Sequence, residues 1–359
     1  MKIPVYKDEQ RGTWYAMFYG TDWTGKKHKY KKRGFKLKRE AQEYEREFKL
    51  KQARSCDMLF DTFVDLYYNY SENVKKNRPS TMHNKKNVIE THIRPYFKNK
   101  KVSDITANDI HEWQQELLSQ EYRDTYLRTI HTKLSAILNY AVTFHGLQSN
   151  PCRQAGSMGS KKPDTIDFWT LDEFKTVIPT IVDKPRGYTA IMTLYWSGIR
   201  EGELLALLPT DIIKKDKGGY ALSITKTWQI VDGEELVGPP KSESGIRQVD
   251  IPKFLGKQLE KYMGMLYECP DDVRIFYGAT KSFLAYEITR GSEKSGIKKI
   301  RVHDLRHSHV SLLRKLGYSF EVIAKRIGHE DIKYVIETYN HIFPDVEESI
   351  VKNLEDLEE

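Results

Sequence analysis

The chain has 359 residues, 39% of them hydrophobic, so it is long enough to form two or three domains with buried cores. Lys and Arg outnumber Asp and Glu by 58 to 50, and the net charge of +8 favours a polyanionic partner. Cys56, Cys152 and Cys269 fit neither a disulfide framework nor a zinc site, and no secretion signal or membrane-spanning apolar run occurs. We therefore expect a folded, multidomain protein of the reducing cytoplasm.

Residues 1–55 predict a small DNA-binding domain made of a three-stranded antiparallel sheet and a helix. Aromatic and polar residues alternate over residues 12–35, and residues 37–53 have helical spacing. Nine Lys or Arg and no acidic residue lie between Thr24 and Arg39, a pattern that suits a phosphate backbone, although a solvated basic hairpin would look the same. The candidate DNA-binding residues are Trp14, Tyr19, Lys26, Lys27, Lys29, Lys31, Lys32 and Arg33.

Residues 57–150 predict a second, wholly helical domain. Hydrophobic residues recur with the helical period in four segments, at residues 59–74, 78–97, 106–120 and 124–146. Pro79, Thr106 and Gly146 mark helix boundaries. The stretch that follows is rich in Gly, Ser, Lys and Pro and has no periodicity, so residues 151–165 are expected to form a linker.

Residues 166–359 predict a mainly helical third domain with a small sheet. Residues 220–231 and 246–252 are strand candidates, and we expect them to form a β-hairpin whose long tip spans residues 232–244. The whole chain is thus an α+β multidomain protein.

The stretch HDLRH, residues 303–307, raises the question of a metal site, because His303 and His307 would share one helix face. Zinc enzymes that use this spacing need a glutamate directly after the first histidine, whereas this chain has Asp304 there and places Arg306 beside the metal. No cysteine or glutamate cluster supplies further ligands, so a zinc site is disfavoured. The alternative is that this helix binds an anion.

Other residues of the third domain complete an anion-binding set. Arg200 follows a Ser-Gly turn at the expected start of a helix, where the helix dipole and its guanidinium could hold a phosphate, with Glu203 orienting it. Lys241 is expected at the hairpin tip, His329 after a helix end at Gly328, and Tyr339 ten residues later. Two arginines, two histidines, a lysine and a tyrosine are the groups needed to transfer a phosphodiester without a metal or other cofactor.

These motifs, SGIREGELLAL, KSESGIRQVDIP, HDLRHSHVSLL, IGHEDI and ETYNH, stand in the order found in tyrosine recombinases, and the chain resembles the phage and mobile-element integrases. Upstream, THIRPYF, TANDIHEW and LSAILNYAV resemble the family's core-binding domain, and the basic sheet resembles its arm-type DNA-binding domain.

The resemblance implies a site-specific recombinase that integrates and excises a phage or mobile element through a 3′-phosphotyrosyl intermediate. Its partners would be double-stranded DNA at core and arm-type sites, three further protomers in a tetramer, and an excisionase or a host DNA-bending protein. The implied catalytic set is Arg200, Lys241, His303, Arg306, His329 and the nucleophile Tyr339, supported by Glu203. His307, His309 and His341 are expected to support the structure instead.

Three alternatives stay open: a DNA-binding regulator that does no chemistry, a metal-dependent hydrolase, and a resolvase of chromosome or plasmid dimers. The complete catalytic set disfavours the first, and the lack of a carboxylate cluster disfavours the second. Resolvases usually lack a basic N-terminal sheet, so an integrase is favoured over the third. Finally, an apolar stripe in the acidic tail, residues 345–359, predicts a helix that docks on the catalytic domain or on a neighbouring protomer.

Overall fold

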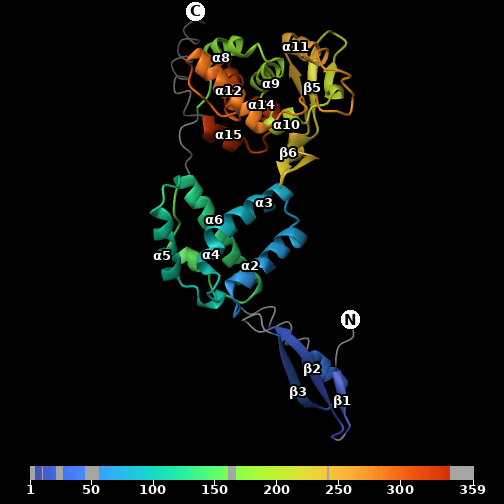
Figure 1. Cartoon of the computed structure of the whole chain (residues 1–359), viewed down its shortest axis with the longest axis vertical. Coiled ribbons are helices and arrows are strands. Elements are labelled where there is room, and N and C mark those ends of the chain that lie inside the picture. Colours follow the sequence, from blue (N-terminus) through green and yellow to red (C-terminus); the bar gives the residue numbers. More distant parts are fainter. Residues whose placement is uncertain are drawn as a thin grey trace, which may run out of the picture. The chain divides into compact units, whose positions relative to one another are not determined.

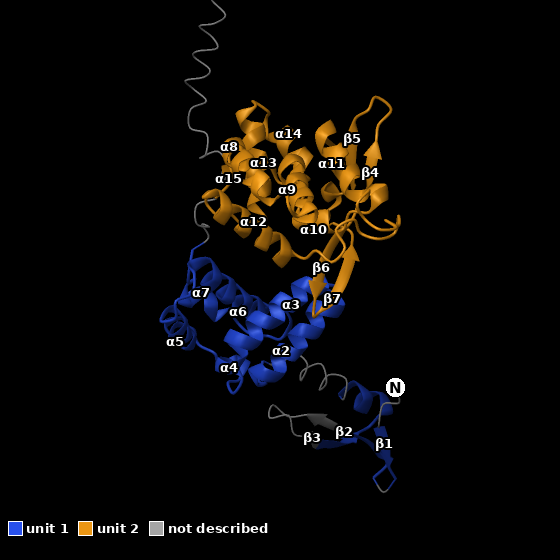
Figure 2. Cartoon of the chain, turned by 45° about the horizontal axis from the view of Figure 1, so that its top comes forward, with its two compact units in different colours: residues 1–164 blue, residues 165–359 orange. Residues whose placement is uncertain are grey.

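The computed structural model describes residues 5–9, 11–21, 27–44, 56–160, 167–240 and 242–339. Two compact units divide the chain, residues 1–164 and residues 165–359, shown in blue and orange in Figure 2. Figure 1 shows strands in the first part of the chain, helices in the middle, and helices with small sheets in the last part. The expected α+β multidomain class is confirmed.

The N-terminal segment forms a three-stranded antiparallel sheet in the order β1 (Val5–Asp8), β2 (Thr13–Thr21) and β3 (Lys27–Phe35). Residues 38–44 are helical, and Ala41 packs with Ala16 and Phe18 in a small core. Alternate residues of a strand point to opposite faces, so one face of this sheet is covered by the helix and the other is open to solvent. The remainder of the expected helix lies outside the described residues.

The four predicted helical segments of the middle part are all present. The first is α2 (Phe60–Asn69), which runs into a π-helical turn (Tyr70–Val74). The second joins α3 (Pro79–Val88), a π-helical turn (Ile89–Ile93) and α4 (Arg94–Phe97), and the others are α5 (Ala107–Leu118) and α6 (Asp124–Phe144). Pro79 occupies the first position of α3, and Thr106 caps α5 by accepting a hydrogen bond from the Asp109 amide.

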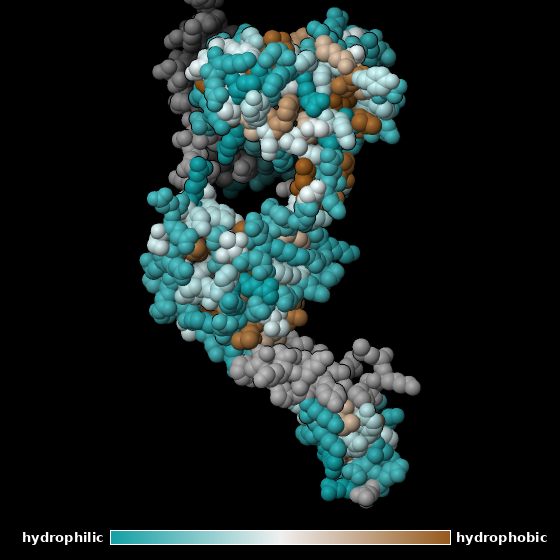
Figure 3. Space-filling model, in the orientation of Figure 1, coloured by the Kyte–Doolittle hydropathy of each residue, from teal (hydrophilic) through white to brown (hydrophobic). Residues whose placement is uncertain are grey.

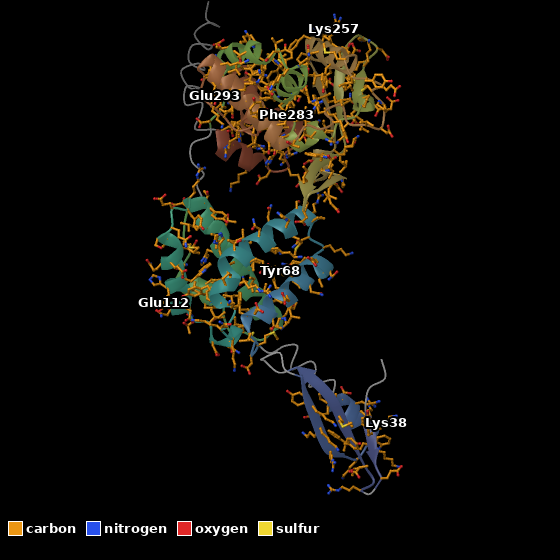
Figure 4. The ribbon with its side chains drawn as sticks, in the orientation of Figure 1. Lys38, Tyr68, Glu112, Lys257, Phe283 and Glu293 are labelled. Atoms are coloured by element: carbon orange, nitrogen blue, oxygen red, sulfur yellow. The ribbon has the colours of Figure 1, made fainter. Side chains whose placement is uncertain are left out.

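The apolar faces of these helices meet in one core, in which Phe60, Phe63, Trp113, Ile130 and Leu134 are buried. Polar side chains tie neighbouring helices at its edge: Tyr68, labelled in Figure 4, donates a hydrogen bond of 2.9 Å to Glu90.

The expected linker differs from the structure in its first part. Asn150 caps a short helix, α7 (Pro151–Ala155), and the side chains of Cys152 and Met158 are buried in the core of the helical segment. Asn150 also donates to the Ser135 carbonyl and to the Asn139 side chain on α6. These three hydrogen bonds and two buried side chains hold residues 150–158 against the helical segment. The helix within them has only five residues, too few to show a helical period in the sequence.

The second unit is built around α9 (Pro185–Ser197), whose residues are mostly buried. The helices that accompany it are α8 (Leu171–Val177), α10 (Glu201–Leu205), α11 (Lys253–Met263), α12 (Lys281–Ser295), α13 (Asp304–Lys315), α14 (Phe320–Ile327) and α15 (Ile332–Tyr339). Trp169, Phe174, Tyr195, Leu205 and Phe276 lie in the main core of this unit. A smaller apolar cluster joins α13, α14 and α15, and it contains Val310, Ile323, Ile327, Val335 and Tyr339.

The predicted hairpin is confirmed in part: residues 220–224 pair antiparallel with residues 247–251, whereas the rest of the first strand candidate pairs within the expected tip. The first strand candidate is two strands, β5 (Tyr220–Ile224) and β6 (Thr227–Val231). Strand β5 lies between β4 (Ile212–Lys214) and β8 (Arg247–Ile251), whereas β6 pairs with β7 (Glu234–Gly238) in a separate ribbon.

The reason for this ribbon is the Asp232-Gly233 pair, which connects β6 to β7. Both residues have positive φ angles, 53° and 84°, the conformation that a two-residue hairpin turn requires. The expected long tip is thus a second hairpin. Lys241 lies outside the described residues, and its neighbours Pro240 and Ser242 follow β7 rather than standing at a tip.

The surface in the view of Figure 3 is mostly hydrophilic, with hydrophobic residues scattered in small groups. Among the helices that the structure describes, none is long and apolar enough to cross a membrane.

Candidate active site

The Arg306 side chain is buried at the start of α13. It is 5% exposed, and its Nη1 donates a hydrogen bond of 2.9 Å to the Gly198 carbonyl. Its Nη2 is buried and has no hydrogen-bond partner among the described residues. Burial, followed by the charge of Arg200, lowers the pKa of Arg306. A buried guanidinium with an unused donor favours an anionic ligand, because a negative charge would compensate its desolvation.

His309 packs against the Gly198 turn that accepts this hydrogen bond. Gly198 ends α9 in the left-handed conformation with φ of 68°, and a Cβ there would lie 2.4 Å from the His309 ring. His309 is buried, with Nδ1 2.8 Å from the Tyr195 carbonyl, and its Nε2 accepts a hydrogen bond from Arg326. Arg326 also donates to the Asp250 carbonyl. One histidine therefore connects α9, α13 and α14 beside the turn whose carbonyl accepts the Arg306 hydrogen bond.

Arg200 stands at the N-cap of α10, as the sequence predicts, and Glu203 orients it. The Glu203 carboxylate is 2% exposed and accepts bonds from the Arg200 amide, at 2.9 Å, and from Arg200 Nη1, at 2.8 Å. Arg200 Nη2 donates to the Gly328 carbonyl, the residue before His329. The Arg200 side chain remains 36% exposed, so part of its guanidinium can still meet a ligand.

Arg247, at the start of β8, is the second guanidinium on Glu203. Its Nη2 lies 3.0 Å from Glu203 Oε2, and its Nε donates to the Arg326 carbonyl on α14. Burial opposes ionisation of Glu203, but the hydrogen bond and charge of Arg247, aided by Arg200, outweigh it and lower the pKa of this carboxyl. A single buried carboxylate thus joins α10 to β8, and Arg247 in turn joins β8 to α14.

Tyr339, at the end of α15, has its ring in the apolar cluster of α13 to α15 and is 4% exposed. Its hydroxyl is hydrogen-bonded to Nδ1 of His307 on α13. The phenol also lies close enough to Arg306 to influence that residue's pKa. The structure therefore brings the predicted nucleophile and the buried arginine together within one chain.

His303 and His329 lie in the same electrostatic environment. Burial lowers the pKa of each, and the positive charge of Arg306 is the second cause for both. His303 lies at the N-cap of α13, where the protein surrounds its imidazole but part of the residue stays in contact with solvent, and His329 follows the left-handed Gly328 that ends α14. Both imidazoles are thus neutral at physiological pH beside two arginines, an arrangement that adds hydrogen-bonding groups without adding positive charge.

Five members of the predicted catalytic set are electrostatic or hydrogen-bonding neighbours in this unit: Arg200, His303, Arg306, His329 and the nucleophile candidate Tyr339. Lys241 is the member that lies outside the described residues. Within the described residues, no group of three or more His, Cys, Asp or Glu side chains is placed to hold a metal ion. The geometry can bind an anion and present a hydroxyl to it.

The profile of the phage integrase family matches residues 170–345, that of the phage integrase N-terminal SAM-like domain residues 62–118, and that of an arm DNA-binding domain residues 4–52. The ICEBs1 integrase of Bacillus subtilis strain 168 is 30% identical over 326 residues, which cover 87% of this chain and 87% of that protein. The chain belongs to the phage integrase family. It is a tyrosine recombinase.

Solved integrases share its fold. The Tn1549 transposon integrase, in complex with transposon right end DNA, has a TM-score of 0.67 at 13% identity, covering 83% of this chain and 99% of that one. The lambda integrase tetramer bound to a Holliday junction has a TM-score of 0.56 at 16% identity, covering 92% of this chain and 93% of that one.

In this integrase-family chain, the predicted DNA-binding residues of the N-terminal sheet fall on both faces. Tyr15, Lys31 and Arg33 are close together, with Lys31 Nζ 4.7 Å from the Tyr15 ring centroid, and alternation places Lys29 on that open face. Lys32 and Trp14 lie on the face of the helix: Lys32 Nζ is 4.5 Å from the Tyr44 ring, and Lys38, labelled in Figure 4, is 5.6 Å from that of Trp14. Lys26 and the side chains of Tyr19 and Lys27 lie outside the described residues.

Sequence reasoning missed two residues of this integrase site, Arg247 and His307. Arg247 lies in the KSESGIRQVDIP motif, outside the predicted catalytic set. A signal for its position exists, because Arg247 shares one face of β8 with the buried residues Val249 and Ile251. His307 was expected only to support α13, whereas it contacts the hydroxyl of Tyr339. That contact depends on the crossing of α13 and α15, which sequence spacing does not reveal.

Proposed function

We propose that this integrase cuts DNA by attack of the Tyr339 hydroxyl on a phosphodiester, which leaves a 3′-phosphotyrosyl bond and a free 5′-hydroxyl, and that it rejoins DNA by the reverse step. The observation that carries this proposal is the buried Nη2 of Arg306, which has no partner among the described residues, with the Tyr339 phenol close enough to influence the pKa of that arginine. Nucleophilic catalysis needs such a pairing of a poised hydroxyl with donors aimed at the oxygens that gain charge.

The other residues of the site have distinct roles. Arg200 and Arg306 bind the non-bridging oxygens of the phosphate, a form of electrostatic preorganisation that contributes several kcal/mol for each donor. Glu203 keeps Arg200 at the start of α10 through its two hydrogen bonds. His303 and His329 are neutral donors to the same oxygens. By the family resemblance, Lys241 protonates the leaving 5′ oxygen as a general acid.

We further propose that the reaction serves the integration and excision of a phage or mobile element. The names of the relatives, the ICEBs1 integrase and the Tn1549 transposon integrase, support this role. The basic sheet of residues 5–35, whose open face carries Lys29, Lys31 and Arg33, favours an integrase with arm-type sites over a resolvase. The lambda integrase tetramer on a Holliday junction supports a tetramer as the working state of this chain.

This proposal can be tested with a nicked DNA duplex that releases a short 5′ fragment after cleavage. Because the strand then cannot be rejoined, the covalent protein–DNA adduct accumulates and can be recovered. We expect wild-type protein to form the adduct, also in EDTA, and Tyr339→Phe to bind the duplex with unchanged affinity and form none, because that substitution removes only the hydroxyl. Exposed Tyr318→Phe is the matched control. An adduct in the Tyr339 variant would refute the assignment, and loss of cleavage in EDTA that magnesium or zinc restores would support a metal-dependent reaction.

A further inference from the structure

His307 is in direct contact with the Tyr339 hydroxyl oxygen, although the predicted catalytic set does not include it. Its Nδ1 is hydrogen-bonded to the Tyr339 hydroxyl, and the two ring centroids are 5.4 Å apart at an interplanar angle of 51°. The ring of His303 lies edge to face with the His307 ring, with 5.2 Å between the ring centroids. His307 therefore contacts both the Tyr339 hydroxyl and a second histidine of the predicted catalytic set.

The protonation state of His307 suits a proton acceptor. Burial, followed by the charge of His303, lowers the pKa of His307 to about 4, so the imidazole is neutral at pH 7. A neutral imidazole carries a lone pair on one nitrogen, and the phenol hydroxyl is a donor, so the bond to Nδ1 can run from the tyrosine to the histidine. With the remaining proton on Nε2, the proton of the nucleophile already points at its acceptor.

We propose that His307 accepts the proton of Tyr339 when the tyrosine attacks DNA. The Oη–H bond breaks and Nδ1 of His307 gains the proton, while the oxygen forms its bond to phosphorus. The P–O5′ bond breaks, and its electron pair leaves on the 5′ oxygen, which takes a proton from the general acid. On rejoining, the 5′-hydroxyl returns its proton to the general acid and attacks phosphorus, the bond between phosphorus and the Tyr339 oxygen breaks, and the imidazolium of His307 returns its proton to that oxygen. This inference rests on the proposed function.

The charges around His307 change in the right direction when DNA binds. The groups that influence it are His303, Asp304, Arg301 and Arg306 from α13 and the turn before it, and Tyr339 from α15. Asp304 is engaged by Arg301, whose Nη2 lies 2.9 Å from Oδ1. A phosphodiester held by Arg200 and Arg306 would bring negative charge near the imidazole and raise its pKa, because opposite charges within a few ångströms favour the charged form.

His307→Asn separates proton transfer from positioning. The asparagine amide reaches the place of Nδ1 and its oxygen can accept the tyrosine hydrogen bond, yet it cannot take the proton. In single-turnover cleavage of the nicked duplex at pH 7, we expect His307→Asn to bind DNA with unchanged affinity and to cleave about 100-fold or more slowly. Its rate should then rise about tenfold per pH unit toward alkaline pH, as hydroxide replaces the missing base. His111→Asn, on the exposed face of α5, is the matched control.

A second substrate distinguishes the base from the acid. DNA with sulfur in place of the bridging 5′ oxygen has a leaving group that needs no proton, so it should restore cleavage by Lys241→Ala but not by His307→Asn. Cleavage by His307→Asn at the wild-type rate and with the wild-type pH profile would overturn the inference, since a hydrogen bond alone would then suffice. Rescue of His307→Asn by the sulfur substrate would overturn it as well.

Two further measurements keep the inference testable if the asparagine variant folds poorly. His307→Gln places its amide near Nε2 instead and should be at least as slow, and wild-type cleavage of the sulfur substrate should keep a solvent deuterium isotope effect, because the tyrosine proton still moves. Absence of that effect would contradict the proposed transfer. If wild-type protein forms no adduct at Tyr339, the proposed function itself fails, whereas a normal adduct with a fully active His307→Asn refutes only the role of His307.

Discussion

At the scale of single residues, the site depends on Glu203, a buried carboxylate that contacts two arginines. Such a buried ion pair adds little net stability, because desolvation of the ions offsets much of their attraction. Its role is to fix the positions of the charged groups. Removing the carboxylate would leave Arg247, which is 8% exposed at its side chain, without its counter-ion. Glu203 is therefore a positioning residue for both guanidinium groups.

Glu203→Gln should lower the free energy of unfolding at pH 7 by about 3–5 kcal/mol, the usual effect of breaking a buried pair from one side. The pKa of Glu203 is lowered in the folded state, so its contribution is fully present above the unfolded pKa, about 4.3, and is lost as the pH falls through the lower folded value. Urea unfolding should show the difference between wild type and variant shrinking below pH 4. A constant difference would contradict this assignment; exposed Glu293→Gln (Figure 4) is the control.

His309 adds a second loss of stability at low pH, because it must stay neutral to accept the Arg326 hydrogen bond. Burial and, after it, the charge of Arg326 lower its pKa in the folded state. The unfolded state thus takes up a proton near pH 6.5 that the folded state does not, and stability falls below that pH by up to about 1.4 kcal/mol per unit. His309→Gln should flatten the decline in unfolding free energy between pH 7 and 5, and an unchanged slope would show that His309 is not the group responsible. His111→Gln is the control.

At the scale of elements, the end of α9 fixes the position of Arg306, and two glycines allow a matched test. Gly198 and Gly296 both end helices in the left-handed conformation, but a Cβ at Gly296 has nothing within 4 Å. Gly296→Ala should cost about 1 kcal/mol from backbone strain alone. Gly198→Ala should cost a further 1–3 kcal/mol or so, because its Cβ overlaps the His309 ring, and should slow cleavage through the displaced Gly198 carbonyl. Equal losses in urea unfolding would contradict the packing argument.

The helices of the chain could be predicted because their residues carry local signals. Thr106 and Pro79 mark helix starts, and the ends of α9 and α14 are marked by Gly198 and Gly328. The sheet of the second unit could not be predicted in full, because two strands with similar residues can pair in more than one way. The Asp232-Gly233 signal for the β6–β7 ribbon was present but lay inside a segment read as a loop.

The site was predicted from the order of its motifs rather than from geometry. Arg200 and Glu203 lie on one turn of α10, so their contact follows from spacing. The contact of His307 with Tyr339 spans 32 residues and depends on how α13, α14 and α15 share a small core. Helix crossings of this kind are set by packing, which a single sequence does not encode in any short pattern.

At the scale of the whole molecule, the N-terminal sheet should act on DNA separately from the catalytic unit. Deleting residues 1–55 should leave cleavage of a short core duplex intact and abolish recombination that needs flanking sites. Replacing Lys29, Lys31 and Arg33 by serine should reduce binding to the flanking sites more than Lys32→Ser, because Lys32 lies on the helix-covered face. Full recombination by the truncated protein in a plasmid assay would contradict the arm-binding role.

The most direct test of the account is identification of the amino acid that carries the DNA. Adduct from the nicked duplex would be digested with nuclease and trypsin, and the phosphorylated peptide fragmented in a mass spectrometer. The tryptic peptide after Lys333 contains both Tyr334 and Tyr339, so fragmentation must distinguish them. We expect the phosphate, with the 3′ end of the cut strand attached, on Tyr339. A link to Tyr334 or to any residue outside this peptide would contradict it.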